Sequence, residues 1–276
     1  MDGRGAIDLH SHSLASDGQY PPSEVARLAR AAGVGTWALC DHDTVAGLGE
    51  AAAAAAAQGL RLVPGIELSA FLGAREIHLL GHFVDPSHPA LERFEELLAV
   101  ERRRRMAVIL ERLAALGVPV TAAAVERFSG GRTIGRPHVA RAVVEAGGAA
   151  SVKEAFDRYL GEGRPAFVPR FRLEAAEAVA LVRGAGGTAT VAHPALSGLD
   201  EASLARLAGA GVDGLEVDHP EQPAPERARL RAAAGALGLV ATAGSDFHGP
   251  AVAPDRRLGM VSMGAAALAA LERRRP

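Results

Sequence analysis

Histidine and carboxylate side chains recur in short motifs of this sequence. The segment DLHSHSLASDG at 8–18 contains His10, His12 and Asp17, and the segment SDFH contains Asp246 and His248. Side chains two positions apart on an extended strand point to the same side, so the HxH and DxH pairs can each bind one metal ion. Imidazole and carboxylate donors without thiolate suit Zn²⁺, Mn²⁺ or Fe²⁺. We therefore predict a metal centre.

Further metal-capable side chains follow short apolar runs. They are Asp41, His42 and Asp43 after TWALC, Glu67 in PGIEL, His78 and His82 in REIHLLGH, His193 in TVAHP, and Asp218 and His219 in GLEVDHP. A single histidine is more often a core or surface residue than a metal ligand. Chance, however, does not explain well why acidic residues and histidines follow so many of the predicted strands. The carboxyl ends of the strands of a parallel barrel meet on one face. We therefore expect these side chains to gather there.

The elements that would position these residues alternate along the chain. Apolar runs at 6–9, 36–40, 60–68, 77–84, 188–193, 214–217 and 239–244 indicate buried strands, and amphipathic stretches at 23–32, 44–57, 173–184, 201–208 and 225–237 indicate helices. Such alternation is typical of parallel βαβ units, and about seven of them are enough to close a barrel. The predicted fold class is α/β, a distorted (β/α)7 TIM-like barrel.

The middle of the chain interrupts this alternation. From Pro89 to about Gly163 only helical stretches are recognisable. We therefore predict residues 1–88 and 164–276 as the barrel domain, with residues 89–163 as a helical insertion over one end of the barrel that serves as a substrate cap. The run ERRRR at 101–105 has two interpretations, a solvated helix face or a patch that faces phosphate.

Composition narrows the class of protein. A chain of 276 residues with 49% hydrophobic and 22% charged residues can bury a core, which argues against disorder. The formal net charge of -2 excludes a globally basic nucleic-acid binder. Cys40 is the only cysteine, so no intramolecular disulfide can form. We find no apolar run that could span a membrane or serve as a signal peptide, and we expect a cytoplasmic protein without a membrane partner.

Six motifs, in their order along the chain, resemble those of a known family. DLHSHSLASDG, DHDTVAG, PGIELSA, EIHLLGH, VAHP and GSDFHG look like the motifs of the PHP (polymerase and histidinol phosphatase) family, over residues 8–249. Within this family the chain is most similar to the 3',5'-nucleoside bisphosphate phosphatases that also act as 5'-to-3' RNA exonucleases. The narrower resemblance is carried by GRPHVAR at 135–141 and YLGEGRPAFVP at 159–169.

The resemblance implies the PHP form of the barrel and a site for three divalent metal ions. Mn²⁺ is the expected ion, with Fe²⁺ or Zn²⁺ as alternatives. The implied ligands are His10, His12, Glu67 and Asp246 for the first ion, His78 and His193 with a shared Glu67 for the second, and Asp17, His42 and His248 for the third. Of the other polar residues, Asp8, Asp41 and Asp43 are expected to orient ligands or cap loops, and His82, His88 and His219 to be structural or exposed.

A site of this kind favours phosphoester hydrolysis. Divalent ions lower the pKa of a bound water from about 15.7 toward about 7 and stabilise charge on a phosphoryl group, so a metal-bound hydroxide would be the nucleophile. Together with this metal-bound water, the expected catalytic residues are His193, His248 and Asp246. Either histidine could pass a proton to the leaving oxygen, although metal ligation competes for the same nitrogen atoms.

Substrate recognition needs residues other than the metal ligands. Arg136 and His138 in GRPHVAR, with Arg164 and Arg170 in GRPAFVPR, are the candidates. A guanidinium group can donate two parallel hydrogen bonds to phosphate, and a helix that starts near Pro137 would add backbone N–H groups. The insertion is expected to bind the 5'-phosphate while the metal ions act on the 3' side.

The predicted function is that of a metal-dependent phosphatase or phosphodiesterase. The expected reaction removes the 3'-phosphate of 3',5'-nucleoside bisphosphates such as 3',5'-bisphosphoadenosine, removes nucleotides from short RNA in the 5'-to-3' direction, or does both. The expected partners are a small nucleotide bisphosphate or the 5' end of a short RNA, with no stable protein partner. The alternatives are a histidinol-phosphate phosphatase or another small-molecule phosphomonoesterase and, outside the enzymes, a metal-binding regulatory module.

Overall fold

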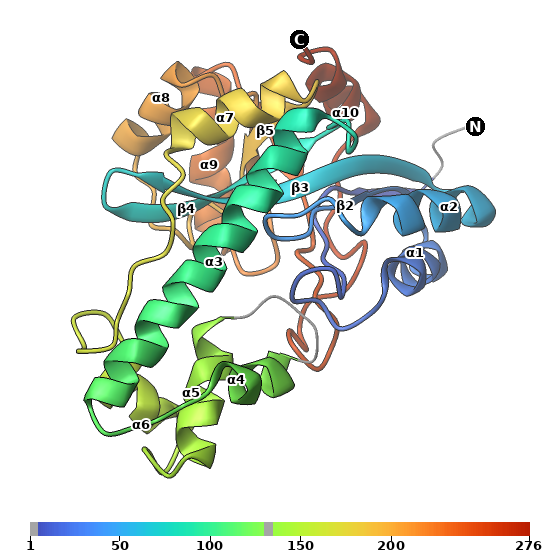
Figure 1. The fold of residues 1–276 in the computed structure, drawn as a ribbon. Coiled ribbons are helices and arrows are strands. Elements are labelled where there is room, and N and C mark those ends of the chain that lie inside the picture. The colour runs from blue at the N-terminus through green and yellow to red at the C-terminus, as the bar shows by residue number, and fades with distance from the viewer. Residues whose placement is uncertain (1–4, 130–134) are drawn as a thin grey trace. The chain divides into compact units, whose positions relative to one another are not determined.

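The computed structural model describes residues 5–129 and 135–276 (Figure 1). The chain divides into two compact units: the sheet unit, Met1–Glu92 with Arg172–Pro276, and the helical unit, Arg93–Phe171. Among the described residues, no helix is both long enough and apolar enough to cross a membrane.

A seven-stranded sheet forms the centre of the sheet unit. Its strands follow one another in chain order: β1 (Ala6–Asp8), β2 (Val34–Leu39), β3 (Arg61–Leu72), β4 (Arg75–His82), β5 (Thr188–Val191), β6 (Gly214–Asp218) and β7 (Val240–Ala243). The predicted α/β class is confirmed, and the sheet is mostly parallel. Backbone contacts also join the segment after β1 to β7 and to the segment after it. Leu9 N–H donates to Ala243 O, at the end of β7, over 3.1 Å, and Ser11 forms an isolated bridge with Phe247.

Strand β4 departs from the predicted parallel arrangement. It runs antiparallel to both β3 and β5. The expectation of parallel units throughout is wrong here because only Gly73 and Ala74 separate β3 from β4, whereas a parallel connection needs a crossover of a dozen or more residues. Gly73 has a φ of 64°, which suits this tight turn.

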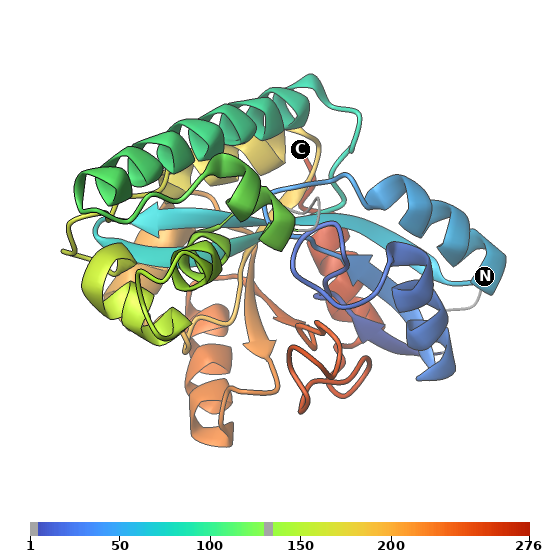
Figure 2. The same cartoon turned by 60° about the horizontal axis from the view of Figure 1, so that its bottom comes forward.

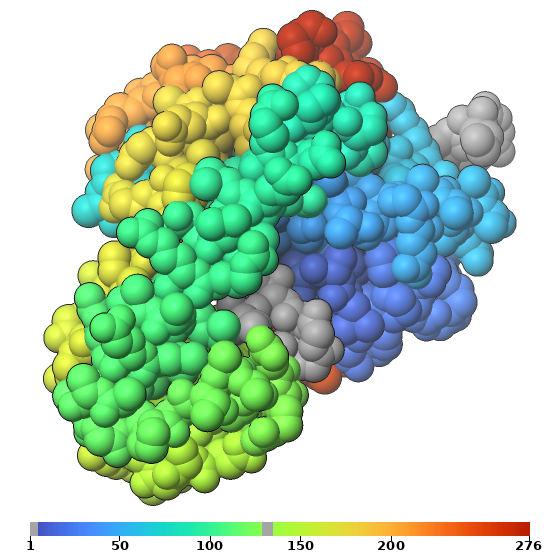
Figure 3. Space-filling model, viewed as in Figure 1, coloured from blue at the N-terminus to red at the C-terminus, as the bar shows by residue number. Residues whose placement is uncertain are grey.

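Helices of the sheet unit pack along the strands. They are α1 (Pro22–Ala31), α2 (Leu48–Gln58), α7 (Ala175–Gly184), α8 (Glu201–Gly209), α9 (Ala224–Ala236) and α10 (Ala265–Glu272). Helices α1 and α2 lie side by side against β2 and β3 (Figure 2), and their outer faces form neighbouring stretches of the surface (Figure 3). Helix α2 begins at Leu48, later than predicted, because Thr44 Oγ1 accepts a hydrogen bond from Ala46 N–H in a preceding turn.

The core of the sheet unit comes from residues of the strands and of the helices that pack on them. Trp37, Leu39, Ile66 and Leu79 are fully buried. Cys40 also lies in an apolar cluster with residues of several strands and of α10. This packing holds the strands, and the side chains that follow them, in fixed positions.

The helical unit has its own apolar core. It contains α3 (Pro89–Ala115), which starts a few residues earlier in the sheet unit, and then α4 (Ala122–Ser129), α5 (Arg136–Glu145), α6 (Val152–Ala155) and the π-helical turn η1 (Phe156–Leu160). Ile109, Leu113, Val125, Val139 and Val143 are buried together. No strand occurs in its described part, 93–129 and 135–171.

Candidate metal centre

The sheet unit brings all nine predicted metal ligands into one cluster around Glu67. This residue lies on β3, and its side chain is 1% exposed. Its two carboxylate oxygens lie near five histidines: Oε2 is 3.2 Å from His10 Nε2, 3.1 Å from His12 Nε2 and 3.3 Å from His42 Nδ1, and Oε1 is 2.9 Å from His78 Nδ1 and 3.2 Å from His193 Nε2. Five histidines from four other places in the chain therefore converge on one buried carboxylate.

Three groups of side chains in the cluster have the geometry to hold a metal ion. They are His10, His12, Glu67 and Asp246; His12, Asp17, His42 and His248; and His42, Glu67 and His78. Within each group one donor atom per residue lies within 4.8 Å of all the others. The first group equals the predicted first ligand set, the second adds His12 to the predicted third set, and the last contains His42 where His193 was expected.

Unpartnered polar atoms show that the cluster suits cations. Five buried side-chain atoms here form no well-aligned hydrogen bond, although three of them lie within 3.3 Å of an ionisable neighbour: His12 Nδ1, His42 Nδ1, His78 Nδ1, His193 Nδ1 and Asp246 Oδ1. Leaving a buried polar atom without a partner costs about 1–3 kcal/mol. Such atoms gathered beside carboxylates fit divalent cations, which take imidazole nitrogen and carboxylate oxygen as ligands.

The charges of the cluster support the same conclusion. Burial by itself raises the pKa of Glu67, but attraction to His42, His10 and His78 outweighs burial and holds this pKa well below its usual range. The Glu67 carboxylate is therefore ionised. Burial also lowers the pKa of His42 to about 4, so this imidazole is neutral near pH 7 and its ring nitrogens can ligate.

The reversed direction of β4 decides which of its two histidines reaches the cluster. His78 pairs with Ser69 in the part of β3 next to Glu67. His82 pairs with Gly65 and with Thr188, further from the strand ends that carry the cluster. Its buried Nε2–H donates to Leu9 O over 2.9 Å, and burial lowers the pKa of His82 to about 4, so it is a neutral structural residue.

The aspartates predicted to support the ligands do hold loops. Asp8 accepts hydrogen bonds from Ser245 N–H and Gly259 N–H, each over 2.9 Å. Asp41 accepts from Ser13 N–H over 2.7 Å, and Asp43 accepts from Ser69 N–H over 2.9 Å. His88, also expected to be structural, accepts from Ala90 N–H over 3.3 Å at the start of α3. These contacts order the loops beside the strand ends.

Two side chains outside the predicted ligand set orient Asp246. Its Oδ2 lies 3.3 Å from His219 Nε2 and also accepts a hydrogen bond from Arg256 Nη1. Because His219 Nδ1 accepts from Glu221 N–H, the His219 proton is on Nε2 and is donated to Asp246. His219 is fully buried. Because these contacts engage Oδ2, the other carboxylate oxygen of Asp246, Oδ1, faces His10 and His12.

Glu216 on β6 is a residue that sequence reasoning missed. Its carboxylate, 1% exposed, contacts His10 and the backbone of His193. The sequence pointed instead to Asp218, two positions on, but that side chain pairs with Arg231 at 2.7 Å, away from the cluster. A carboxylate inside the apolar run GLEV was the available signal, since a charged group in a buried strand needs a partner.

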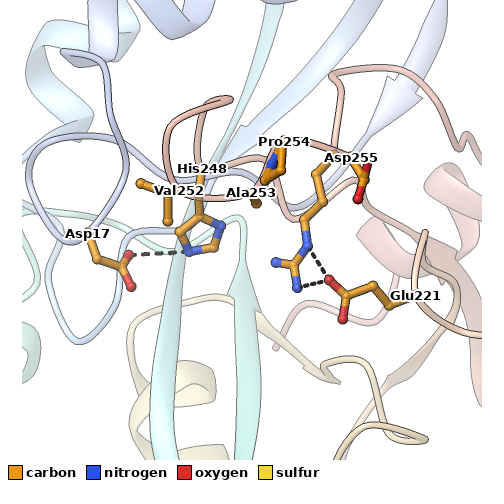
Figure 4. A pocket seen from close by; sticks show the side chains of 8 residues that line it. Asp17, Glu221, His248, Val252, Ala253, Pro254 and Asp255 are labelled. Carbon is orange, nitrogen blue, oxygen red and sulfur yellow. Dashed lines mark hydrogen bonds and ion pairs between the residues drawn. The ribbon is translucent and has the colours of Figure 1, made fainter. Parts of the chain in front are cut away.

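A cavity of about 330 Å³ opens beside two of the predicted ligands. It is lined by Asp17, His248, Glu221 and the residues 252–256, and the Arg256 guanidinium pairs with Glu221 on one wall (Figure 4). The Asp17 side chain is 57% exposed and lies 3.3 Å from His248 Nε2. A volume of this size is in the range of small-ligand sites, so the cavity gives molecules in solution access to this part of the cluster.

The predicted substrate-binding residues all belong to the helical unit. Arg136 lines a small cavity of about 20 Å³ with Arg102 and Arg105 of the arginine run. Its guanidinium also lies over the Phe167 ring, 5.3 Å from the ring centre. Three cationic side chains thus surround one cavity at the start of α5, where Pro137 is in the first turn as expected.

The other predicted substrate-binding residues are placed differently. His138 Nδ1 accepts a hydrogen bond from Gly135 N–H over 3.0 Å and so caps the N-terminus of α5. Arg164 and Arg170 are exposed and do not line the cavity of Arg136. In the run at 101–105, Arg105 Nε also donates to Val168 O over 2.8 Å, which ties α3 to the segment after η1.

The fold and the site together define the class of protein. It is a metal-binding α/β protein with a cluster of buried histidines and carboxylates at the strand ends of a mostly parallel sheet. The chain belongs to the PHP domain family, whose sequence model matches residues 8–160. The 5'-3' exoribonuclease Rnm of Escherichia coli (strain K12) is 35% identical over 249 residues, which cover 88% of this chain and 85% of that protein. The 3',5'-nucleoside bisphosphate phosphatase of Chromobacterium violaceum is 35% identical over 251 residues, which cover 88% and 87%.

Solved structures agree with this assignment. A crystal structure from Bifidobacterium adolescentis, provisionally described as a metal-dependent phosphoesterase, superposes with a TM-score of 0.79 at 32% identity and covers 98% of this chain and 96% of that one. The predicted family and the predicted class of enzyme, a phosphoester hydrolase, are confirmed by these relatives.

Proposed function

We propose that the protein is a metal-dependent phosphoesterase that removes the 3'-phosphate of 3',5'-nucleoside bisphosphates, removes nucleotides from the 5' end of short RNA, or does both. The observation that carries this proposal is the buried cluster around Glu67, where carboxylates and unpartnered imidazole nitrogens converge. The names of the two relatives, a bisphosphate phosphatase and an exoribonuclease, support the choice of substrates.

Three divalent ions, Mn²⁺ first among the candidates, are proposed to occupy the cluster. The proposed ligands are His10, His12, Glu67 and Asp246; His78, His193 and the shared Glu67; and Asp17, His42 and His248. Bound divalent ions lower the pKa of water and stabilise the charge of a phosphoryl group during its transfer. The buried side chains of this chain hold the donors in place and keep bulk water away from them.

A histidine at the edge of the cluster is proposed to protonate the leaving oxygen. His193 and His248 have side chains that are 10% and 9% exposed, so both are within reach of a substrate. His248 Nδ1–H donates to Asp246 O over 2.9 Å, so only Nε2, which faces Asp17, could exchange a proton with a substrate. His193 has an Nδ1 without a hydrogen bond in addition to the Nε2 that faces Glu67. Either histidine is therefore proposed as the proton donor, and Asp246 is proposed as a further catalytic residue.

The remaining parts of the fold are proposed to serve this reaction. The backbone contacts between the segments after β1 and β7 support closure of the strands into a distorted (β/α)7 barrel. Residues 89–163 are proposed to form the inserted substrate cap, with Arg136, His138, Arg164 and Arg170 as its phosphate-binding residues. Among these, the cavity shared by three arginines favours Arg136.

Metal removal tests the proposed function most directly. Protein stripped of metal should release no phosphate, and added Mn²⁺ should restore hydrolysis of 3',5'-bisphosphoadenosine with a kcat/KM at least about a hundredfold above that for histidinol phosphate. A short 5'-phosphorylated RNA in a parallel assay shows whether mononucleotides are also released.

Each other outcome points to a different function. Activity that persists after thorough stripping would contradict metal-dependent hydrolysis. A preference for histidinol phosphate would support the alternative phosphatase, and metal binding without hydrolysis of any of these substrates would support a regulatory module.

The phosphate-binding role of Arg136 can be tested by Arg136→Ala. A charge-assisted hydrogen bond is worth about 1.5–3 kcal/mol, so KM for 3',5'-bisphosphoadenosine should rise about 10- to 100-fold, and KM for a nucleoside monophosphate should change much less. Arg141→Ala removes an exposed arginine from the same helix and serves as the matched control. Equal effects of Arg136→Ala on both substrates would refute selective binding of the second phosphate.

A further inference from the structure

The carboxylate of Glu216 joins two of the proposed metal ligands. Its Oε1 accepts a hydrogen bond from His10 Nδ1 over 3.0 Å, and its Oε2 accepts one from the backbone N–H of His193 over 2.7 Å. Glu216 lies on β6, whereas His10 follows β1 and His193 follows β5. One buried side chain thus connects segments that are far apart in the sequence.

The contact with Glu216 determines how His10 can bind a cation. An ionised carboxylate only accepts hydrogen bonds, so the proton that it receives is on His10 Nδ1. The other ring nitrogen, Nε2, lies 3.2 Å from Glu67 Oε2 and 3.0 Å from His12 Nε2, inside the cluster. Once its Nε2 has lost its proton to make way for a cation, an imidazole held in this tautomer directs the Nε2 lone pair at the cluster.

The second contact of Glu216 holds an unusual backbone conformation. His193 has a φ of 25°, a sparsely populated value for a residue with a side chain. A conformation of this kind persists only where surrounding contacts enforce it. The hydrogen bond from His193 N–H to Glu216 is such a contact, and the resulting backbone path brings His193 Nε2 to 3.2 Å from Glu67 Oε1.

Gly244, after β7, makes room for this arrangement. A Cβ atom at this position would collide with the Cβ of His10 and would lie 2.6 Å from Glu216 Oε1. Any larger residue would therefore push His10 and Glu216 apart. The absence of a side chain at Gly244 therefore allows His10 and Glu216 to approach each other closely.

We propose that Glu216 is a positioning residue of the metal centre: it keeps the proton of His10 on Nδ1 and holds the backbone of His193, so that both rings present Nε2 to a cation. The proposal rests on the proposed function, because it assigns His10 and His193 as ligands. Histidine ligands supported in this way commonly lose about 10- to 100-fold in metal affinity when the supporting carboxylate is replaced.

The variant Glu216→Gln tests the proposal. Its amide has one acceptor oxygen where the carboxylate has two, so at least one of the two hydrogen bonds must break. In metal-free protein, NMR should show the loss of the hydrogen-bonded His10 Nδ1–H signal or at least about tenfold faster exchange of the His193 amide. The same variant should bind Mn²⁺ about 10- to 100-fold more weakly than the unmodified chain. Glu216→Asp, which keeps two acceptors, should recover part of that affinity.

Asp213→Asn is the matched control. Asp213 is also a buried carboxylate with two hydrogen-bond donors, Arg183 Nη1 at 2.9 Å and Ala189 N–H at 3.0 Å, and it contacts none of the proposed ligands. This variant should lower the melting temperature but leave Mn²⁺ affinity within about twofold of the unmodified chain.

Other results would separate the two proposals. Unchanged NMR signals in Glu216→Gln, or a broken hydrogen bond with unchanged Mn²⁺ affinity, would overturn the positioning role. An unmodified chain that binds none of Mn²⁺, Fe²⁺ and Zn²⁺ would overturn the proposed function. In that case the signals of His10 and His193 in metal-free protein would still show whether Glu216 positions these residues.

Discussion

Replacing Glu67 with glutamine should reduce kcat/KM for 3',5'-bisphosphoadenosine by about a thousandfold, because this carboxylate is central to two of the three proposed ion sites. Both of its carboxylate oxygens contact histidines: Oε1 lies near His78 and His193, and Oε2 lies near His10, His12 and His42. An amide has no negative charge and only one acceptor oxygen. Transition-state stabilisation by such ions is worth several kcal/mol, and each 1.36 kcal/mol corresponds to a tenfold change in rate.

Elemental analysis should accompany the kinetics of Glu67→Gln. We expect fewer bound Mn²⁺ ions per chain and an unchanged circular dichroism spectrum. Glu272→Gln is the matched control, since Glu272 is an exposed glutamate on α10 that pairs with Arg61 at 2.7 Å. A Glu67→Gln variant with the full metal content and near-normal kcat/KM would rule out a shared ligand at this position.

Asp17→Asn should remove one metal ion and most of the activity while the fold stays intact. Asp17 Oδ1 lies 3.3 Å from His248 Nε2, and Oδ2 lies 3.8 Å from His42 Nε2. Its side chain is 57% exposed, so the core does not depend on it. Asparagine keeps the shape but loses the charge that a third cation would need, and an ion that supplies several kcal/mol corresponds to a loss of about 10²- to 10³-fold in kcat.

Metal counting decides the outcome for Asp17→Asn. The variant should retain the ions held by the other two proposed ligand sets and should melt within about 2 °C of the unmodified chain when both are metal-free. Asp255→Asn, in the wall of the same cavity, should keep the full metal content. Loss of every ion in Asp17→Asn would contradict the proposed division of ligands.

Much of the candidate site could be predicted from local sequence. His10 and His12 are two positions apart, and the structure places their Nε2 atoms 3.0 Å from each other, as two side chains on one side of an extended segment should be. The strand pattern likewise predicted that donors from distant segments would meet. Chain order and residue type were sufficient here because the alternation of side chains along a strand, and of strands and helices along the chain, follows local rules that repeat from one unit to the next.

Other parts of the site required the tertiary structure. Position along the strand does not distinguish His78 from His82, because the choice depends on the direction of β4 in the sheet, and only the family motif pointed to His78. It also offers Glu216 and Asp218 on one strand, and only the packing of β6 beside His10 shows which carboxylate faces the cluster. The cavity that joins Arg136 with Arg102 and Arg105 depends on the fold of the helical unit in the same way.

The donor types, their spacing and the alternation of strands and helices that brings the donors to the strand ends can all be read from the amino-acid sequence. Only the three-dimensional fold shows which donors lie close enough to share an ion, which side chains hold them, and which polar residues of the same strands lie elsewhere. The reason is physical. Ligand identity is a property of single residues and short motifs, whereas the partner of each nitrogen and oxygen depends on strand direction, register and packing between segments far apart in the chain.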